Sequence, residues 1–376
     1  MKVVICGAGR TGHLSAVLFK QRGGVRVSVL TAAAELEQRW REGARIWHAR
    51  LPDDSILTGD IDLVATDPRV VLDEADLVVI THPAHARPRA LRQIAAHLPK
   101  KKPVYVGGIP GFCGFDWLAQ DAFRTRDNVV IWGMKDVPHI ACDLVPGEKV
   151  RMGGAKSELY VALHRRETLA SRAVVHEALS NLYDAPVTML NDYLEITLTP
   201  GNALMHPAVL YGLFGPGAEW ESKSLDEPIC WWSDCPLAGA EMLEACDADN
   251  QAIKRAAEQR LGIDLSSVKP LKQELIEAYG NQIGDDSTMY TLLRTNRAYA
   301  GIELPLVFSS NGSGLAVDRN SRAFHEDIAF GQALLLEMAR RLEVAVPAID
   351  ETYHWATAYH GNLPRPSLNY VPAQWG

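Results

Sequence analysis

The chain has 376 residues, 47% of them hydrophobic and 22% charged, which is typical of a folded globular protein and excludes wholesale disorder. A chain of this length exceeds one ordinary hydrophobic core, so we expect two domains. The 38 Lys and Arg residues against 46 Asp and Glu residues give a formal net charge of −8 at pH 7. This charge argues against nucleic acid or an anionic membrane surface as the main partner.

The cysteines and the N-terminal residues exclude further classes. The six cysteines are scattered and none forms a C-x-x-C pair, so the sequence indicates neither a metal site nor a disulfide framework. The first apolar run is too short for a secretion signal, and no stretch approaches the roughly 18 apolar residues of a membrane-spanning helix. We therefore expect a cytoplasmic protein that holds no metal.

The first half of the chain alternates short β-branched runs with helical patterns. Strands are expected at Lys2–Cys6, Arg26–Leu30, Leu77–Thr81, Pro103–Gly107 and Val129–Trp132, with helices such as His13–Arg22 and Pro88–Leu98 between them. Residues 149–163 are expected to be extended around a turn at Gly153-Gly154. This alternation predicts an α/β Rossmann-type domain, a doubly wound parallel sheet with helices on both faces.

After about residue 185 the pattern becomes helical. Residues 236–261 form one long helical pattern that Gly262 stops, and residues 328–342 repeat apolar side chains on one helical face until Pro347 ends the pattern. We therefore expect a dinucleotide-binding Rossmann domain over residues 1–187. An all-helical domain that binds the substrate and carries the catalytic residues is expected over residues 188–376.

A glycine-rich turn, Gly7-Ala8-Gly9-Arg10-Thr11-Gly12, follows the first expected strand and leads into the first expected helix. In this context Gly7 permits the tight turn, Gly9 lets the backbone approach a pyrophosphate, and Gly12 lets the helix lie close to the strand. The helix N-terminus offers unpaired N–H groups and a partial positive charge to the anion. The six residues together predict a site for a nicotinamide dinucleotide.

The choice between NADP(H) and NAD(H) depends on the end of the second expected strand, where NAD enzymes usually carry Asp or Glu for the ribose 2′-hydroxyl. Here that strand ends in Thr31, and the first carboxylate is Glu35. Without a carboxylate at the strand end a 2′-phosphate meets no repulsion, and Arg10, Arg39 and Arg41 are candidates for its countercharge. NADP(H) is therefore favoured and NAD(H) stays open. Arg39 and Arg41 fit solvated helix positions as well.

An enzyme that transfers a hydride also moves a proton, so a histidine with a carboxylate partner is the expected acid/base. Among twelve histidines, His206 has the most suggestive setting, Asn202-Ala203-Leu204-Met205-His206-Pro207-Ala208. Pro207 suits the first position of a helix, which would place His206 at the helix entrance. Taken alone, a histidine before a proline is more often a surface or capping residue.

A second group of charges, residues 322–331, opens the last long helical pattern. Arg322 can grip a carboxylate bidentately, which suits an anionic 2-oxo acid. Asp327, expected in the first helical turn, would be kept ionised by the helix dipole and can then orient and support an imidazolium. Taken alone, these charges more often mark a solvated helix start.

Three motifs follow one another along the chain: the N-terminal G-x-G-x-x-G, then Asn-x-x-x-His-Pro, then Arg-x-x-x-Glu-Asp-x-x-x-Gly. In this order they resemble the octopine/nopaline (opine) dehydrogenase family, and the similarity runs over most of the chain. Residues 145–156 and 296–302 match the family too. The family commonly has Glu-Asp-Ile-Pro in the last motif, whereas Ala329 replaces that proline here, which indicates a divergent member.

The resemblance implies an enzyme that condenses the amino group of an amino acid with a 2-oxo acid, often pyruvate, and reduces the imine to a secondary amine. It implies that His206 is the acid/base and Asp327 its partner. Arg322 would anchor a substrate carboxylate, with Asn202 also in the substrate site. The expected partners are these small molecules, and a homodimer is left open.

Two other functions stay open. A ketopantoate-reductase-like or hydroxyacid dehydrogenase shares the architecture but commonly uses a lysine as acid/base, and Lys254, Lys269 and Lys272 have no recognisable context. A non-catalytic NADP sensor needs no proton relay, so the histidine, arginine and aspartate named above argue against it. The aromatic and acidic stretches 219–221 and 230–234 fit either a pocket for a cationic or aromatic amine or simple packing.

Overall fold

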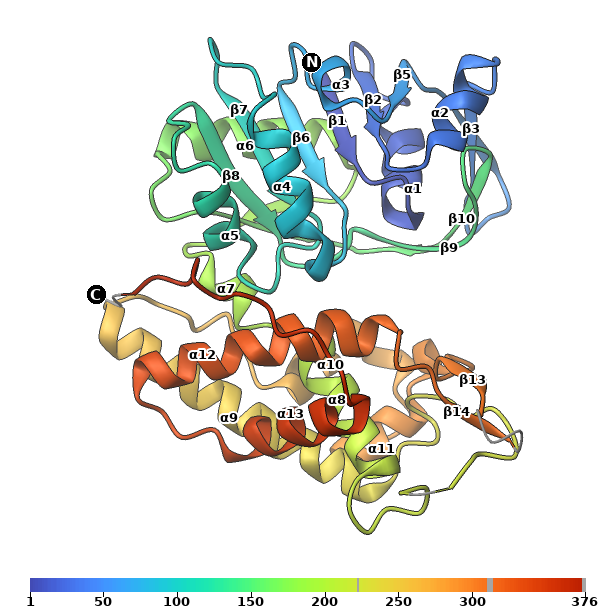
Figure 1. Ribbon diagram of the computed structural model, residues 1–376, viewed down its shortest axis with the longest axis vertical. Coiled ribbons are helices and arrows are strands. Elements are labelled where there is room, and N and C mark those ends of the chain that lie inside the picture. The colour runs from blue at the N-terminus through green and yellow to red at the C-terminus, as the bar shows by residue number, and fades with distance from the viewer. Residues whose placement is uncertain (222, 310–313, 374–376) are drawn as a thin grey trace. The chain divides into compact units, whose positions relative to one another are not determined.

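The computed structural model describes residues 1–221, 223–309 and 314–373, and the chain divides into two compact units, Met1–Thr197 and Leu198–Gly376 (Figure 1). This division falls further along the chain than the predicted boundary between residues 187 and 188. Strand β12 (Val187–Met189) belongs to the first unit because it pairs in parallel with β11 (Leu159–Leu163). The short helix α7 (Leu194–Thr197) then completes that unit.

The main sheet of the first unit has eight strands within the described residues 1–221, in the order β12-β11-β8-β7-β6-β1-β2-β5. Its other strands are β1 (Lys2–Cys6), β2 (Arg26–Leu30), β5 (Leu63–Ala65), β6 (Leu77–Ile80), β7 (Val104–Gly108) and β8 (Val129–Met134). Neighbouring strands pair in parallel except β8 and β11, which are antiparallel. The strands predicted from the sequence lie side by side, so the Rossmann-type sheet is confirmed.

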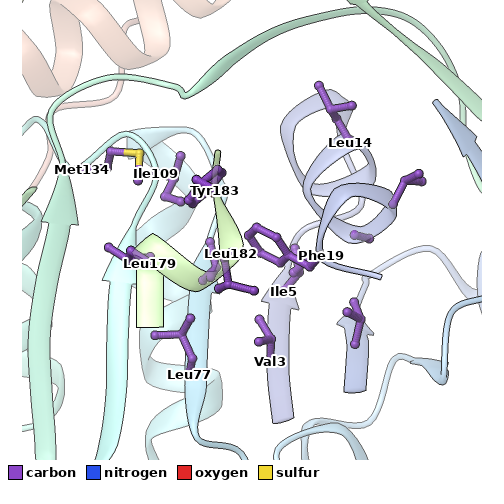
Figure 2. Close-up of a cluster of buried hydrophobic side chains, with 14 of the residues drawn as sticks. Val3, Ile5, Leu14, Phe19, Leu77, Ile109, Met134, Leu179, Leu182 and Tyr183 are labelled. Atoms are coloured by element: carbon purple, nitrogen blue, oxygen red, sulfur yellow. The ribbon is translucent and has the colours of Figure 1, made fainter. Parts of the chain in front are cut away.

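Helices cover this sheet and fix the glycine-rich turn (Figure 1). They are α1 (Arg10–Phe19), α2 (Ala34–Arg41), α3 (Pro68–Val71), the 3-10 turn η1 (Ala84–Ala86), α4 (Arg87–Ala95), α5 (Phe115–Ala122) and α6 (Leu169–Leu182). Figure 2 shows Leu14 and Phe19 of α1 in one cluster with Ile5 of β1 and Leu182 of α6. Each such side chain contributes roughly 1.5–3 kcal/mol by leaving water, so the cluster holds α1 firmly on β1.

A second sheet, which the sequence did not predict as a separate unit, has the strand order β4-β3-β10-β9. Its strands are β3 (Ile46–Arg50), β4 (Ile56–Asp60), β9 (His139–Val145) and β10 (Lys149–Ala155). The turn predicted at Gly153-Gly154 is wrong, because both glycines lie inside β10, where the pairing with β9 shifts register between Met152 and Gly154. Glycine inside a strand is typical of such a bulge.

The second unit is helical, as predicted, with one short ribbon among its described residues. The helices are α8 (Asn202–Phe214), α9 (Leu237–Leu261), α10 (Leu271–Tyr279), η2 (Gly280–Gln282), α11 (Met289–Thr295), η3 (Arg297–Tyr299), η4 (Ala323–Gln332), α12 (Ala333–Leu342) and α13 (Pro347–His360). Strands β13 (Leu306–Phe308) and β14 (Leu315–Val317) form the antiparallel ribbon. Among the described helices none is long and apolar enough to cross a membrane.

The helix predicted over residues 328–342 is two elements in the structure. Residues 323–332 form a π-helix, η4, and α12 follows it directly. Glu343, with φ 59°, ends α12 in the left-handed region. Pro347 does not end this helix, because α12 has already ended at Leu342. Pro347 begins α13 instead, a position that suits a proline because the first turn needs no N–H partner. π-helical segments are rare and occur frequently at functional sites.

Candidate active site

The glycine-rich turn has the geometry that its sequence predicted. Gly7 has φ 114°, and a Cβ added to Gly12 would lie 1.9 Å from the Gly7 carbonyl oxygen. Both positions therefore require glycine. A Cβ on Gly9 would meet nothing within 4 Å, so the backbone at the N-terminus of α1 is open to a ligand. Arg10 is exposed and Thr11 is half-buried at this end of the helix.

A cavity of about 430 Å³ lies at the carboxyl ends of β1, β2, β5 and β6. Its lining includes Cys6, Thr31, Thr66, His82, Arg89 and Gln93. Thr31 is buried, and its hydroxyl accepts the Ala33 N–H at 3.1 Å. Nδ1 of His82 is buried and, among the described residues, has no hydrogen-bond partner. A lining that combines apolar side chains with a few polar ones, including an unsatisfied nitrogen, beside an open glycine turn fits a dinucleotide.

The structure places two of the proposed 2′-phosphate countercharges elsewhere. Arg39 donates to the Pro146 carbonyl at 3.0 Å, and Arg41 pairs with Glu37. Neither arginine lines the cavity, and Arg10 does not line it either. These partners give Arg39 and Arg41 no support as countercharges, and their role at a 2′-phosphate stays a prediction.

His206 and Asp327, 121 residues apart in sequence, are joined by a 2.8 Å contact between Nδ1 and Oδ2. The side chain of His206 is 16% exposed and that of Asp327 is 5% exposed. The predicted position of His206 at the helix entrance is wrong, because α8 begins at Asn202 and holds Pro207 inside it. The two residues are brought together by the packing of α8 against η4.

The electrostatics of Asp327 differ from the prediction as well. Asp327 lies beyond the first turn of η4, which ends at Glu326, so the helix dipole has less effect on it than predicted. Burial raises the pKa of Asp327, and the hydrogen bond with His206 opposes that rise. A carboxylate that accepts from Nδ1–H fixes the ring tautomer and leaves Nε2 to exchange a proton.

Aromatic rings surround the imidazole. The ring of His206 stacks on Trp231 with centroids 4.3 Å apart and lies 5.6 Å from the Trp232 ring. Trp232 in turn lies 5.2 Å from Tyr299, at the end of η3. Trp231 and Trp232 of the aromatic stretch 230–234 therefore lie at the histidine. Tyr299, which the sequence did not single out for a role, packs against Trp232. The rings restrict the imidazole to one plane.

Of the two expected substrate-binding residues, Asn202 lies on the helix of His206, and Arg322 is the residue before the helix of Asp327. Arg322 precedes η4, its side chain is 68% exposed, and its Nε donates to Glu326 Oε2 at 2.7 Å. Glu326 itself is buried at 1% exposure. Asn202 is exposed at the first position of α8. The role of Arg322 and Asn202 in binding substrate stays a prediction.

Comparison with known proteins gives one consistent result. Residues 189–360 match the family model of the α-helical domain of NAD/NADP octopine/nopaline dehydrogenases. An uncharacterized protein of Sinorhizobium fredii is 66% identical over 375 residues, which cover 100% of this chain and 99% of the relative. Octopine dehydrogenase of Pecten maximus is 28% identical over 369 residues, covering 95% and 89% respectively. A structure of octopine dehydrogenase with NADH and L-arginine aligns with a TM-score of 0.85 at 27% identity, covering 96% of this chain and 90% of that chain.

Proposed function

Because this chain belongs to the octopine/nopaline dehydrogenase family and is a nicotinamide-dependent oxidoreductase, we propose that it condenses an amino acid with a 2-oxo acid such as pyruvate. The product is an N-(carboxyalkyl) amino acid, and the reaction also runs in reverse. The observation that carries the proposal is the 2.8 Å contact between His206 and Asp327, because the reduction of an imine consumes a proton.

The bond changes assign work to these two residues. The amine nitrogen adds to the ketone carbon, water leaves, and the resulting imine accepts one hydride and one proton to give the secondary amine. The bound nicotinamide supplies the hydride. His206 takes the protons that the attacking amine loses and returns them through Nε2 to the departing oxygen, which leaves as water. It then passes a proton from solvent to the imine nitrogen as the hydride adds, and this proton transfer contributes about 10²–10⁴-fold to the rate. Asp327 keeps the ring oriented and stabilises the imidazolium, while Arg322 and Asn202 bind the substrate.

We assign the cofactor as NADP(H) in preference to NAD(H), since Thr31 stands where a carboxylate selects NAD. Thr31→Asp places a negative charge at the carboxyl end of β2 and repels a 2′-phosphate. We expect the ratio of kcat/KM with NADPH to that with NADH to fall by about 10-fold or more, on the scale of a charged hydrogen bond. Steady-state kinetics with both cofactors measure this ratio, and a wild-type enzyme that prefers NADH contradicts the assignment.

The proposed reaction is tested by following NADPH absorbance with pyruvate, 2-oxoglutarate and glyoxylate, each with and without a panel of amino acids. Oxidation that requires both substrates, with the secondary amine found by mass spectrometry, supports the proposal. Oxidation with the oxo acid alone identifies a hydroxyacid dehydrogenase or ketopantoate-reductase-like enzyme. No substrate-dependent oxidation with any pair favours the non-catalytic sensor.

The lysines of the second unit give the hydroxyacid alternative little support. Lys254 lies 3.9 Å from Glu258, Lys269 lies 2.5 Å from Glu277, and Lys272 donates to the Ser287 carbonyl. Each of these three lysines therefore contacts a residue other than His206 and Asp327. A lysine acid/base should instead face the aromatic rings and the carboxylate that surround His206.

A further inference from the structure

The residues that line the 430 Å³ cavity all lie within the described residues 1–221. Among them, Arg89 of α4 is the residue whose side chain is always charged. His82 also lines the cavity, but burial lowers its pKa, so its ring is neutral at neutral pH. The cavity also includes Thr31 and Ala32, where β2 ends. In a dinucleotide fold this end of the second strand faces the ribose of the adenosine half.

The neighbouring Arg87 shows what an arginine with a structural role does in this helix. Arg87 is 1% exposed and donates to the carbonyls of His82, Pro110 and Phe112 at 2.7–3.0 Å. Arg89 is exposed, and no hydrogen bond or ion pair of its guanidinium occurs among the described residues. Its charge therefore faces the cavity without a structural task.

The carboxylate that is hydrogen-bonded to Thr66, a residue of the cavity lining, does not cancel this charge. Glu37 accepts the N–H and the hydroxyl of Thr66, each at 2.7 Å, and these bonds lower the pKa of its carboxyl. Its other oxygen pairs with Arg41. Since Arg41 neutralises Glu37, the guanidinium of Arg89 is left as the net charge at this cavity.

We propose that Arg89 binds the ribose 2′-phosphate of NADP(H) and thereby sets the cofactor preference; this rests on the proposed NADP(H) assignment but not on the opine reaction. A phosphate monoester carries about −1.5 to −2 charges at pH 7 and matches the planar fork of a guanidinium. Such a contact adds affinity only for ligands that have the 2′-phosphate.

The test measures binding of two fragments to the enzyme without substrate by calorimetry: adenosine 2′,5′-bisphosphate and adenosine 5′-monophosphate. Arg89→Gln should weaken the bisphosphate by about 10-fold or more, on the scale of a charged hydrogen bond, and change the monophosphate less than about 2-fold. Arg89→Lys should fall between wild type and Arg89→Gln, because it keeps the charge and loses the fork. Arg92→Gln is the matched control, an exposed arginine of the same helix that does not line the cavity.

The outcomes separate this proposal from the assignment on which it rests. A wild-type enzyme that prefers the bisphosphate, with Arg89→Gln unchanged, overturns the role of Arg89 and leaves the NADP(H) assignment standing. Equal loss of both fragments also overturns it and shows that Arg89 contacts the adenine or shapes the cavity. A wild-type enzyme that binds both fragments equally overturns the cofactor assignment together with the role of Arg89. Melting temperatures of the variants confirm that each is folded.

Discussion

The two units of this enzyme make their sites by opposite means. In the first unit the geometry of the glycine turn depends on the absence of side chains at Gly7 and Gly12, and the backbone at Gly9 is open. In the second unit the site depends on particular atoms, with Nδ1 of His206 held by Asp327. Backbone recognition accepts any pyrophosphate, whereas a fixed imidazole determines which proton moves. Binding and chemistry should therefore be separable by mutation.

Burial shifts the pKa values of histidines and of carboxyls in opposite directions, and it also raises the pKa of Asp116 in the first unit to about 8. In the first unit burial lowers the pKa of His13, His139 and His164 to about 4. In the second unit burial raises the pKa of Asp247, Asp249 and Asp327. Acid lowers the stability of the fold through the buried neutral histidines, because each must take up a proton and become charged. Acid relieves the desolvation penalty of these carboxyls, because protonation removes their charge.

The largest effect on cofactor affinity is expected from Gly12→Ala, which places a Cβ against the Gly7 backbone oxygen, where no side-chain rotation relieves the clash. NADPH affinity should fall by about 100-fold or more, with a loss of stability of about 1–3 kcal/mol. Gly9→Ala is the matched control: it meets nothing in the protein, so it should keep wild-type stability and lose affinity alone. Calorimetric titration and urea unfolding measure the two quantities. Wild-type NADPH affinity in Gly12→Ala contradicts the role of the turn.

A smaller effect, on the use of the oxo acid and not on cofactor binding, is expected from Arg322→Lys. If the guanidinium binds a substrate carboxylate, losing its planar fork should lower kcat/KM for the oxo acid by about 10–100-fold. NADPH affinity should stay at the wild-type value, because the glycine turn lies in the other unit. Arg340→Lys is the control, since its side chain is also 68% exposed and also pairs with a glutamate on its own helix. An equal loss of cofactor affinity in Arg322→Lys shows that the residue does not serve the substrate alone.

The smallest effect concerns stability in acid. His13 is fully buried and stacks on Trp47 at 4.4 Å, and burial lowers its pKa from 6.5 to about 4. Since the unfolded chain takes up this proton first, the contribution is present above pH 6.5 and is lost as the pH falls towards 4. The loss is about 3 kcal/mol at most.

His13→Phe keeps a ring against Trp47 and removes the titration. The fall in the free energy of unfolding between pH 6.5 and pH 4 should shrink by up to that amount, as measured by urea unfolding across this range. The exposed His176→Gln in α6 should leave the fall unchanged. An unchanged fall in His13→Phe means that other groups cause the acid sensitivity.

Local patterns in the sequence were enough for the central strands and the glycine turn, because a β-branched run or six consecutive residues carry that information. The same patterns failed where a distant segment decides. Gly153-Gly154 suits both a turn and a bulge, and only pairing with β9 distinguishes them. Pro207 suits a first turn, but the helix begins earlier, at Asn202. The π-helix η4 has no 3.6-residue signal by which it could be predicted.

The candidate site shows the same limit. Local settings drew attention to His206 and to Asp327 separately, but the two were joined as a pair through a family resemblance, because no local pattern links residues 121 positions apart. The contact of Arg39 with the Pro146 carbonyl and the position of Arg89 in the cavity depend on tertiary packing. His82 lies just beyond the carboxyl end of β6, the strand that pairs with β1. Because dinucleotides bind at the carboxyl ends of such strands, this position in the sequence could have indicated the cavity.

The central claim is that His206 and Asp327 act as one unit, and a double-mutant cycle tests it most directly. His206→Ala and Asp327→Ala should each lower kcat by about 10²–10⁴-fold, and the double variant should be little worse than the worse single variant. Asp327→Asn, which keeps the size but not the charge, should resemble Asp327→Ala in turnover, and NADPH binding should survive in all variants. Losses that multiply in the double variant, or a His206→Ala enzyme that stays active, contradict the account.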